Sequence, residues 1–252
     1  MARTPHSHHR LLLTFFFLPA LAGAQTSKSV NCSSELPRFQ AALEAAEKQA
    51  PGEVKSAAQQ SALKQIADCQ VELGNLDAAE TALWRRKDVL TAWRGAQSAA
   101  VADNYHELAF IQIQRQAWGR AERWALEAVV IYDALLAKVL ESQASAANSQ
   151  GAARNAPKQT GMRANVAREV NALNGSKVAA LYTWGLAIAL QKRTDEALKI
   201  WETAYVIGEQ LKPPPKVLLQ IAQQAIELHD MTGRRAGRDV WVARMRKIRN
   251  AK

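Results

Sequence analysis

Few residues of this chain are of a type and spacing that could do chemistry. Beyond residue 24 there are two cysteines, Cys32 and Cys69, and two histidines, His106 and His229. An isolated cysteine pair in an oxidising compartment typically forms a disulfide, and two free thiols are the alternative. A disulfide would close a loop of about 38 residues and stabilise the fold by roughly 4 kcal/mol. It would pin the N-terminal segment onto the helices that follow.

No motif indicates catalysis. The chain has no G-x-S-x-G elbow, no P-loop, no G-x-G-x-x-G and no H-E-x-x-H. A histidine within a predicted helix, such as His106, is more often a partly exposed helix residue than a general base. The two histidines are also not spaced as metal ligands are. Carboxylates such as Asp77 and Asp195 fall in the first turns of predicted helices, where they complement the helix dipole. The sequence therefore predicts no enzyme, no cofactor and no metal site.

The first 24 residues have the features of a secretory signal peptide. Arg3 and Arg10 give a positive start, residues 11–18 are apolar except for Thr14, and Ala22–Ala24 form an A-x-A cleavage signature. The apolar run is too short for a membrane anchor. The alternative, a buried N-terminal helix, would need a polar face, and this run has none. We therefore expect cleavage after Ala24 and a soluble periplasmic or secreted protein.

The remaining composition predicts an all-α protein. Glycine and proline are few, at 12 and 8 residues in the whole chain, and the apolar residues recur at helical spacing. Small residues recur in pairs 12 residues apart, one inside a predicted helix and one opening the next. These pairs are Ala67 with Ala79, Ala109 with Ala121, and Gly185 with Ala197. Small residues at these places allow two helices to approach closely, and such helix pairs must stack to bury their apolar faces.

These helix pairs resemble tetratricopeptide repeats (TPR) over about residues 56 to 250. Ala79 and Ala121 are 42 residues apart, so the repeats look like the longer kinesin-light-chain type rather than the usual 34-residue form. The first copy departs from the family pattern, because Arg86 stands where the family prefers alanine. The resemblance implies an α-solenoid of about four antiparallel helix pairs plus an N-terminal helix.

The expected organisation follows from this pattern. It comprises a signal peptide (1–24), an N-terminal segment and helix (25–55), helix pairs one and two (56–141), a flexible insertion (142–175), and helix pairs three and four with a basic C-terminal helix (176–252). The insertion is rich in Ser, Ala, Asn, Gln and Gly without apolar periodicity, which is typical of a lid or an inert spacer. A short helix is expected within it from Met162 to Leu173, ended by Asn174-Gly175.

The resemblance also implies a binding groove, because exposed positions of the first helix of each pair line the concave surface in this family. Carried over residue by residue, these positions are Lys64, Asp68, Asp103, His106, Phe110, Tyr182, Leu186, Lys216 and Gln223. We expect them to form a mixed polar and aromatic groove for a peptide, with Phe110 and Tyr182 as anchors. The alternative is that many of them pack against neighbouring repeats.

The C-terminal end is strongly basic. The predicted basic patch comprises Arg234, Arg235, Arg238, Arg244, Arg246, Lys247 and Arg249. It is either a solvated terminal helix whose cations suit its dipole, or a contact for anionic lipid headgroups or an acidic partner. Nucleic acid is not expected, because the export signal argues against it.

The sequence therefore favours a non-catalytic periplasmic TPR-type adaptor or scaffold. It would bind another envelope protein or peptide in secretion, in pilus or outer-membrane assembly, or in cell-wall maintenance. The alternative is a regulatory subunit that recognises a small ligand or a glycan in the solenoid groove.

Overall fold

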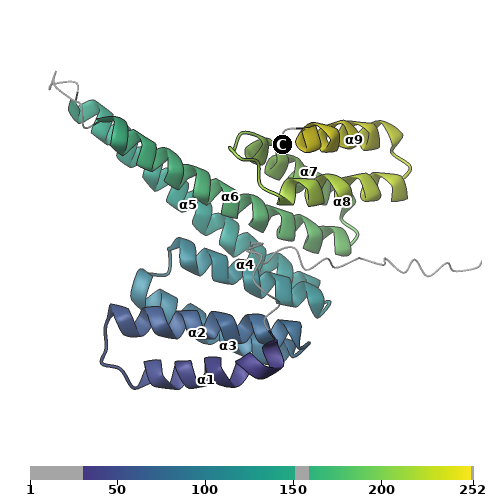
Figure 1. The fold of residues 1–252 in the computed structure, drawn as a ribbon. Coiled ribbons are helices and arrows are strands. Elements are labelled where there is room, and N and C mark those ends of the chain that lie inside the picture. Colours follow the sequence, from purple (N-terminus) through teal and green to yellow (C-terminus); the bar gives the residue numbers. More distant parts are fainter. Residues whose placement is uncertain (1–30, 151–158, 251–252) are drawn as a thin grey trace, which may run out of the picture. The chain divides into compact units, whose positions relative to one another are not determined.

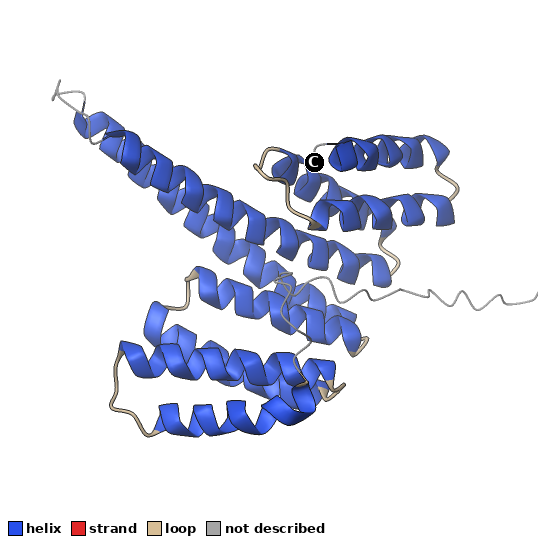
Figure 2. Cartoon of the chain, viewed as in Figure 1, coloured by secondary structure: helices blue, strands red, loops and turns tan. Residues whose placement is uncertain are grey.

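The computed structural model describes residues 31–150 and 159–250, and these contain helices and loops but no strand (Figure 2). The predicted signal peptide lies outside the described residues. The described residues form nine helices: α1 (Cys32–Glu47), α2 (Glu53–Glu72), α3 (Leu76–Arg94), α4 (Ala99–Gln114), α5 (Trp118–Gln150), α6 (Gln159–Leu190), α7 (Thr194–Glu209), α8 (Val217–Met231) and α9 (Arg235–Asn250).

Consecutive helices pack as antiparallel pairs (Figure 1). The pairs are α2 with α3, α4 with α5, α6 with α7, and α8 with α9, and α1 packs on α2. Each pair also packs on the next, and the first helices touch one another from α4 to α6 and from α6 to α8. The described part of the chain is therefore an all-α solenoid of four helix pairs preceded by one helix, as the sequence predicts.

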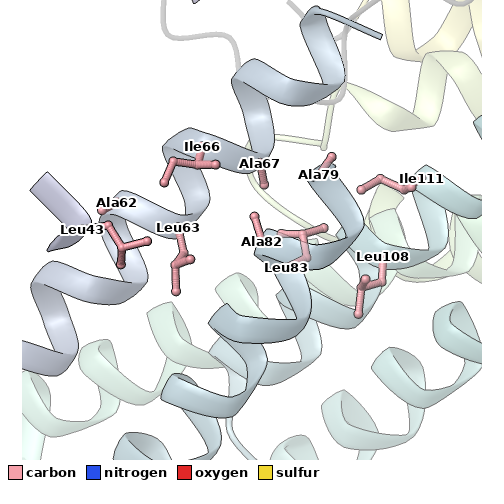
Figure 3. Packing of buried hydrophobic residues seen from close by; sticks show 10 residues of the cluster. All are labelled: Leu43, Ala62, Leu63, Ile66, Ala67, Ala79, Ala82, Leu83, Leu108 and Ile111. Atoms are coloured by element: carbon pink, nitrogen blue, oxygen red, sulfur yellow. The ribbon is translucent and has the colours of Figure 1, made fainter. Parts of the chain in front are cut away.

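The small residues that the sequence places 12 residues apart are buried between the paired helices. Ala79, Ala109, Ala121 and Ala197 are completely buried, and Ala67 is 2% exposed. Larger side chains surround them, and Figure 3 shows such a cluster, in which Leu63, Leu83 and Leu108 lie among buried alanines. The alanines therefore let the paired helix backbones approach closely, while leucine and isoleucine side chains fill the layers around them.

Helix α1 covers the open end of the first pair. Its Leu43 and Ala46 are buried, and Leu43 belongs to the same core cluster as Leu63 (Figure 3). The predicted disulfide is present: Cys32 at the start of α1 is bonded to Cys69 near the end of α2. The bond fixes one end of α1, and Glu47 at the other end pairs with Arg85 of α3.

Helices α5 and α6 are longer than the sequence predicts. At 33 and 32 residues they are about 50 Å long, roughly twice the length of α4 or α7. The described parts of segment 142–175 belong to these two helices, where the sequence predicted a flexible insertion. The segment is rich in alanine, the strongest helix former, and Val166 and Val170 within it are half-buried. Asn174-Gly175 does not end a helix, because α6 continues through it.

The third pair, α6 with α7, is packed too closely at one point to accept even a methyl group. A Cβ atom added at Gly185 would stand 2.3 Å from Nε1 and 2.6 Å from Cδ1 of Trp201, which is 1% exposed. The indole cannot retreat freely, because its Nε1 donates a hydrogen bond of 3.2 Å to the Tyr182 carbonyl.

We predict that Gly185→Ala lowers the free energy of unfolding by about 1–3 kcal/mol, because the added methyl group overpacks the Trp201 site. Urea denaturation measures this change. Gly175→Ala in the same helix is the control, since a Cβ there meets nothing within 4 Å, and it should stabilise by about 0.5–1 kcal/mol. Equal stability of the two variants would contradict the close packing.

Candidate functional site

The turn within each helix pair is built in the same way in all four pairs, and this gives a register for comparing the first helices. A backbone N–H donates to the carbonyl five residues earlier: Asn75 to Gln70 (2.8 Å), Ala117 to Gln112 (2.8 Å), Arg193 to Ile188 (3.2 Å) and Arg234 to His229 (3.0 Å). The residue directly before each donor has a positive φ: Gly74, Gln116, Lys192 and Gly233. Equivalent residues of α2, α4, α6 and α8 can therefore be counted back from these four donors.

Seven of the nine predicted groove residues occupy two equivalent positions, and Asp103 and Lys216 stand outside them. Eleven residues before the donor stand Lys64, His106, Tyr182 and Gln223, and seven residues before it stand Asp68, Phe110, Leu186 and Glu227. We call these eight residues, together with Asp103 and Glu107 of α4, the first-helix face. Sequence reasoning missed Glu107 and Glu227. Glu227 follows Gln223 by four residues, just as Asp68 follows Lys64, so the repeat register was the signal that could have found it.

Contacts between neighbouring first helices make this face continuous. Nζ of Lys64 on α2 lies 3.5 Å from Oε1 of Glu107 on α4. Nε2 of His106 on α4 lies 2.8 Å from Oγ1 of Thr183 on α6. Helix α6 packs on α8, and burial of the phenol raises the pKa of Tyr182 on α6, with Glu227 of α8 raising it further. The face therefore extends across α2, α4, α6 and α8.

The contacts of Arg86 give a structural reason for the departure of the first repeat from the TPR pattern. Its side chain on α3 is 8% exposed, and its Nη1 donates to Oε2 of Glu107 at 2.9 Å and to Oδ1 of Asn104 at 3.3 Å. Burial raises the pKa of Glu107, while Lys64 and Arg86 oppose that rise. The arginine therefore supplies the counter-charge for a carboxylate that the first-helix face holds half-buried.

His106 lies in a polar contact between the second and third pairs. The Thr183 hydroxyl donates to the Ala179 carbonyl at 3.3 Å, so it accepts from Nε2–H of a neutral His106 ring. Burial lowers the pKa of His106 to about 4, although Asp103 acts in the opposite direction. Asp103 is itself held by a hydrogen bond from the Tyr132 hydroxyl. The histidine is therefore uncharged at neutral pH and adds no positive charge to the face.

The predicted groove residues differ in accessibility. Asp68, Lys216 and Gln223 are exposed, and Lys64, Asp103, His106 and Phe110 are half-buried. Tyr182 and Leu186, by contrast, are buried at 8% and 6% exposure. Tyr182 packs in a stacked arrangement with Trp201, with ring centroids 6.5 Å apart. It was expected to be an exposed anchor, but it forms the floor of the face, and Phe110 is the aromatic side chain that solvent reaches.

Much of the predicted basic patch is occupied by ion pairs. Arg234 pairs with Asp195, Arg244 with Glu202, and Lys247 with Glu209, which are three carboxylates spaced seven residues apart on α7. Arg238 pairs with Asp230 and Asp239.

Arg244 also lies over aromatic rings, 4.6 Å from the Tyr205 centroid and 4.5 Å from the Trp241 centroid. Arg235, Arg246 and Arg249 are exposed and have no ion pair within the described residues. Four of the seven predicted cations are therefore paired with carboxylates of α7 and α8.

A shallow hollow of about 420 Å³ lies at the α2–α3 turn, lined by Gly74, Asn75, Leu76, Asp77, Ala78 and Arg115. Within the described ranges, no group of His, Cys, Asp and Glu side chains is arranged to hold a metal ion. None of the described helices combines the length and hydrophobicity that crossing a membrane requires.

The fold defines a class of protein: a TPR-like α-solenoid. Comparison with solved structures supports this assignment. The crystal structure of BtubC (BKLC) from P. vanneervenii matches with a TM-score of 0.65 and 16% identity, over 88% of this chain and 74% of that one. The nearly identical TPR-like repeats of a kinesin light chain from Podosopora anserina match with a TM-score of 0.50 and 14% identity, over 86% of this chain and 90% of that one. No family model matches the sequence, and no curated protein matches it.

The neutral His106 gives a prediction for pH. Its pKa is lower in the folded protein than the ordinary value of 6.5, so the unfolded chain binds more protons between about pH 4 and 6.5. The contribution of the neutral ring is fully present above pH 6.5 and is lost as the pH falls to about 4, by up to about 3 kcal/mol.

Urea unfolding of the native protein and of His106→Gln at pH 4.5, 5.5 and 7 tests this prediction. A glutamine amide can still donate to Thr183 but does not titrate, so the variant should lose less stability on acidification. The difference between the two curves removes the effect of His229, whose pKa burial also lowers. Parallel curves would contradict the assignment.

Proposed function

We propose that this protein is a non-catalytic adaptor of the periplasm or cell envelope, which binds a partner protein on its first-helix face. One observation carries the proposal. Contacts from Lys64 to Glu107 and from His106 to Thr183 join polar and apolar side chains of successive helices into one surface. TPR-like folds build extended binding surfaces from successive repeats in this way. The process served would be an envelope process such as secretion, pilus or outer-membrane assembly, or cell-wall maintenance.

The location rests on the leader of the chain and on the disulfide. Residues 1–24 have the pattern of a cleaved export signal, and the bond between Cys32 and Cys69 suits an oxidising compartment.

Export is tested by expressing the full chain in a bacterial host and separating periplasm from cytoplasm. We predict that the periplasmic protein begins at Gln25, as determined by N-terminal sequencing. Leu13→Arg interrupts the apolar run of the leader and should leave the uncleaved chain in the cytoplasm. Retention of the native chain in the cytoplasm at full length would refute the proposed location.

Partner binding is tested with variants of exposed or half-exposed apolar side chains. Phe110→Ala should weaken capture of an envelope protein at least tenfold, because aromatic anchors dominate interface energies. The matched control is Leu126→Ala, which removes a 39% exposed apolar side chain from the second helix α5. Circular dichroism of both variants checks that they fold.

Equal capture by the two variants would contradict a role for the first-helix face. The regulatory alternative predicts a different outcome: a glycan or small metabolite would raise the melting temperature of the native protein, and no protein partner would be captured.

A further inference from the structure

The residues seven positions before the turn donors form an ordered row across the four first helices. In the order α2, α4, α6, α8 they are Asp68, Phe110, Leu186 and Glu227. The row therefore has a carboxylate at each end and two apolar side chains in the middle. Asp68 and Glu227 are exposed, Phe110 is half-buried, and Leu186 lies beneath the surface at 6% exposure.

The surroundings of the row increase its negative charge. Asp103 and Glu107 add two carboxylates beside Phe110, and the counter-charge of Glu107 is the buried Arg86 of α3. The only cation among the eight equivalent residues is Lys64, and it is already paired with Asp68 and Glu107. Lys216 stands 11 residues before Glu227 on α8, which places it about 16 Å away, beyond the screening length in physiological salt.

This local charge differs in sign from the chain as a whole. The sequence carries a net charge of +10. Yet α2, α4, α6 and α8 together contain eight acidic and five basic residues, and Lys64 is the one basic residue at the two equivalent positions of the first-helix face. Cations of α9 such as Arg244 and Lys247 are paired with α7 and lie on second helices. A charged segment at the first-helix face therefore meets mainly carboxylates.

From this juxtaposition we infer that the first-helix face accepts an extended segment of a partner protein that has an apolar residue at its centre and Lys or Arg on either side. The central side chain lies on Phe110 above Leu186, and the flanking cations pair with Asp68 and Glu227. Packed helices lie 8–10 Å apart, so the three steps from α2 to α8 separate the two end carboxylates by at least about 25 Å. An extended chain covers this distance in about eight or nine residues. The inference rests on the proposed adaptor function and specifies the chemistry of the partner.

The probe is a display library of random 12-residue peptides, panned against the mature disulfide-bonded protein. We expect the recovered peptides to carry Lys or Arg on both sides of a large apolar residue. Fluorescence anisotropy of the recovered peptides then measures binding to two double variants. Asp68→Asn with Glu227→Gln removes the two end carboxylates. Asp88→Asn with Glu127→Gln removes two exposed carboxylates from the second helices α3 and α5 and changes the net charge equally.

The end-carboxylate variant should bind the peptides at least about fivefold more weakly at low salt, and raising the salt should reduce this difference. The second-helix variant should bind them as the native protein does. Peptides that are neutral or acidic, lose binding with Phe110→Ala and ignore the end-carboxylate variant would overturn the inference while leaving the adaptor proposal intact.

Two other outcomes have distinct meanings. If no peptide is recovered, or if those recovered ignore Phe110→Ala, the binding surface itself is wrong and the inference falls with it.

Sedimentation of the native protein over a range of concentrations tests a second copy of the chain as occupant, through the unpaired cations Arg235, Arg246 and Arg249. Self-association that disappears in the end-carboxylate variant would overturn the assignment to another protein.

Discussion

The close approach of the two helices in each pair is the constraint on which the rest of the structure depends. Ala79, Ala121 and Ala197 have no exposed surface, and at Gly185 even a methyl group would collide with the Trp201 indole. A larger side chain at these places would push the helices apart and shift the layers of leucine and isoleucine between pairs. In the first three pairs the small residues therefore determine how far the first helix stands from its partner, and hence where its outward side chains point.

Ion pairs between the turns of successive helix pairs extend this order along the chain. Arg115 at the end of α4 pairs with Asp77 and Glu80 of α3. Nη1 of Arg193 lies 2.9 Å from Oε2 of Glu122 on α5, and Arg234 pairs with Asp195 of α7. Each exposed pair contributes little to stability. In each case, however, an arginine at a turn meets a carboxylate in the first two turns of the preceding second helix. This repeated geometry favours one register between pairs, and that register aligns Asp68, Phe110, Leu186 and Glu227.

The fold could be predicted from the sequence where packing depends on residue size. The 12-residue spacing of small residues gave three of the four pairs, and the cysteine count gave the disulfide. The fourth pair was harder because Ile226 and Arg238 stand at its equivalent places. The length of α5 and α6 was missed, because alanine-rich segments such as 142–150 form helix without apolar periodicity. At the site, the positions were largely predictable, but the burial of Tyr182 was not, since it depends on how Trp201 of the next helix packs.

The polar character of the first-helix face is the part of the sequence that folding explains least. Glu107 is half-buried with a raised pKa and pairs with the buried Arg86. Replacing a buried ion pair by well-packed apolar side chains of similar volume often leaves a protein as stable or more stable. The equivalent of Glu107 in α6 is Thr183, which packs against the neutral His106 without any ion pair, so the solenoid does not need a charged pair at this position. The exposed carboxylates of Asp68 and Glu227 likewise bury no apolar surface. Charges that the fold does not require, held in register beside a solvent-accessible aromatic ring, are what a binding surface needs, and here they coincide with the row that crosses all four helix pairs.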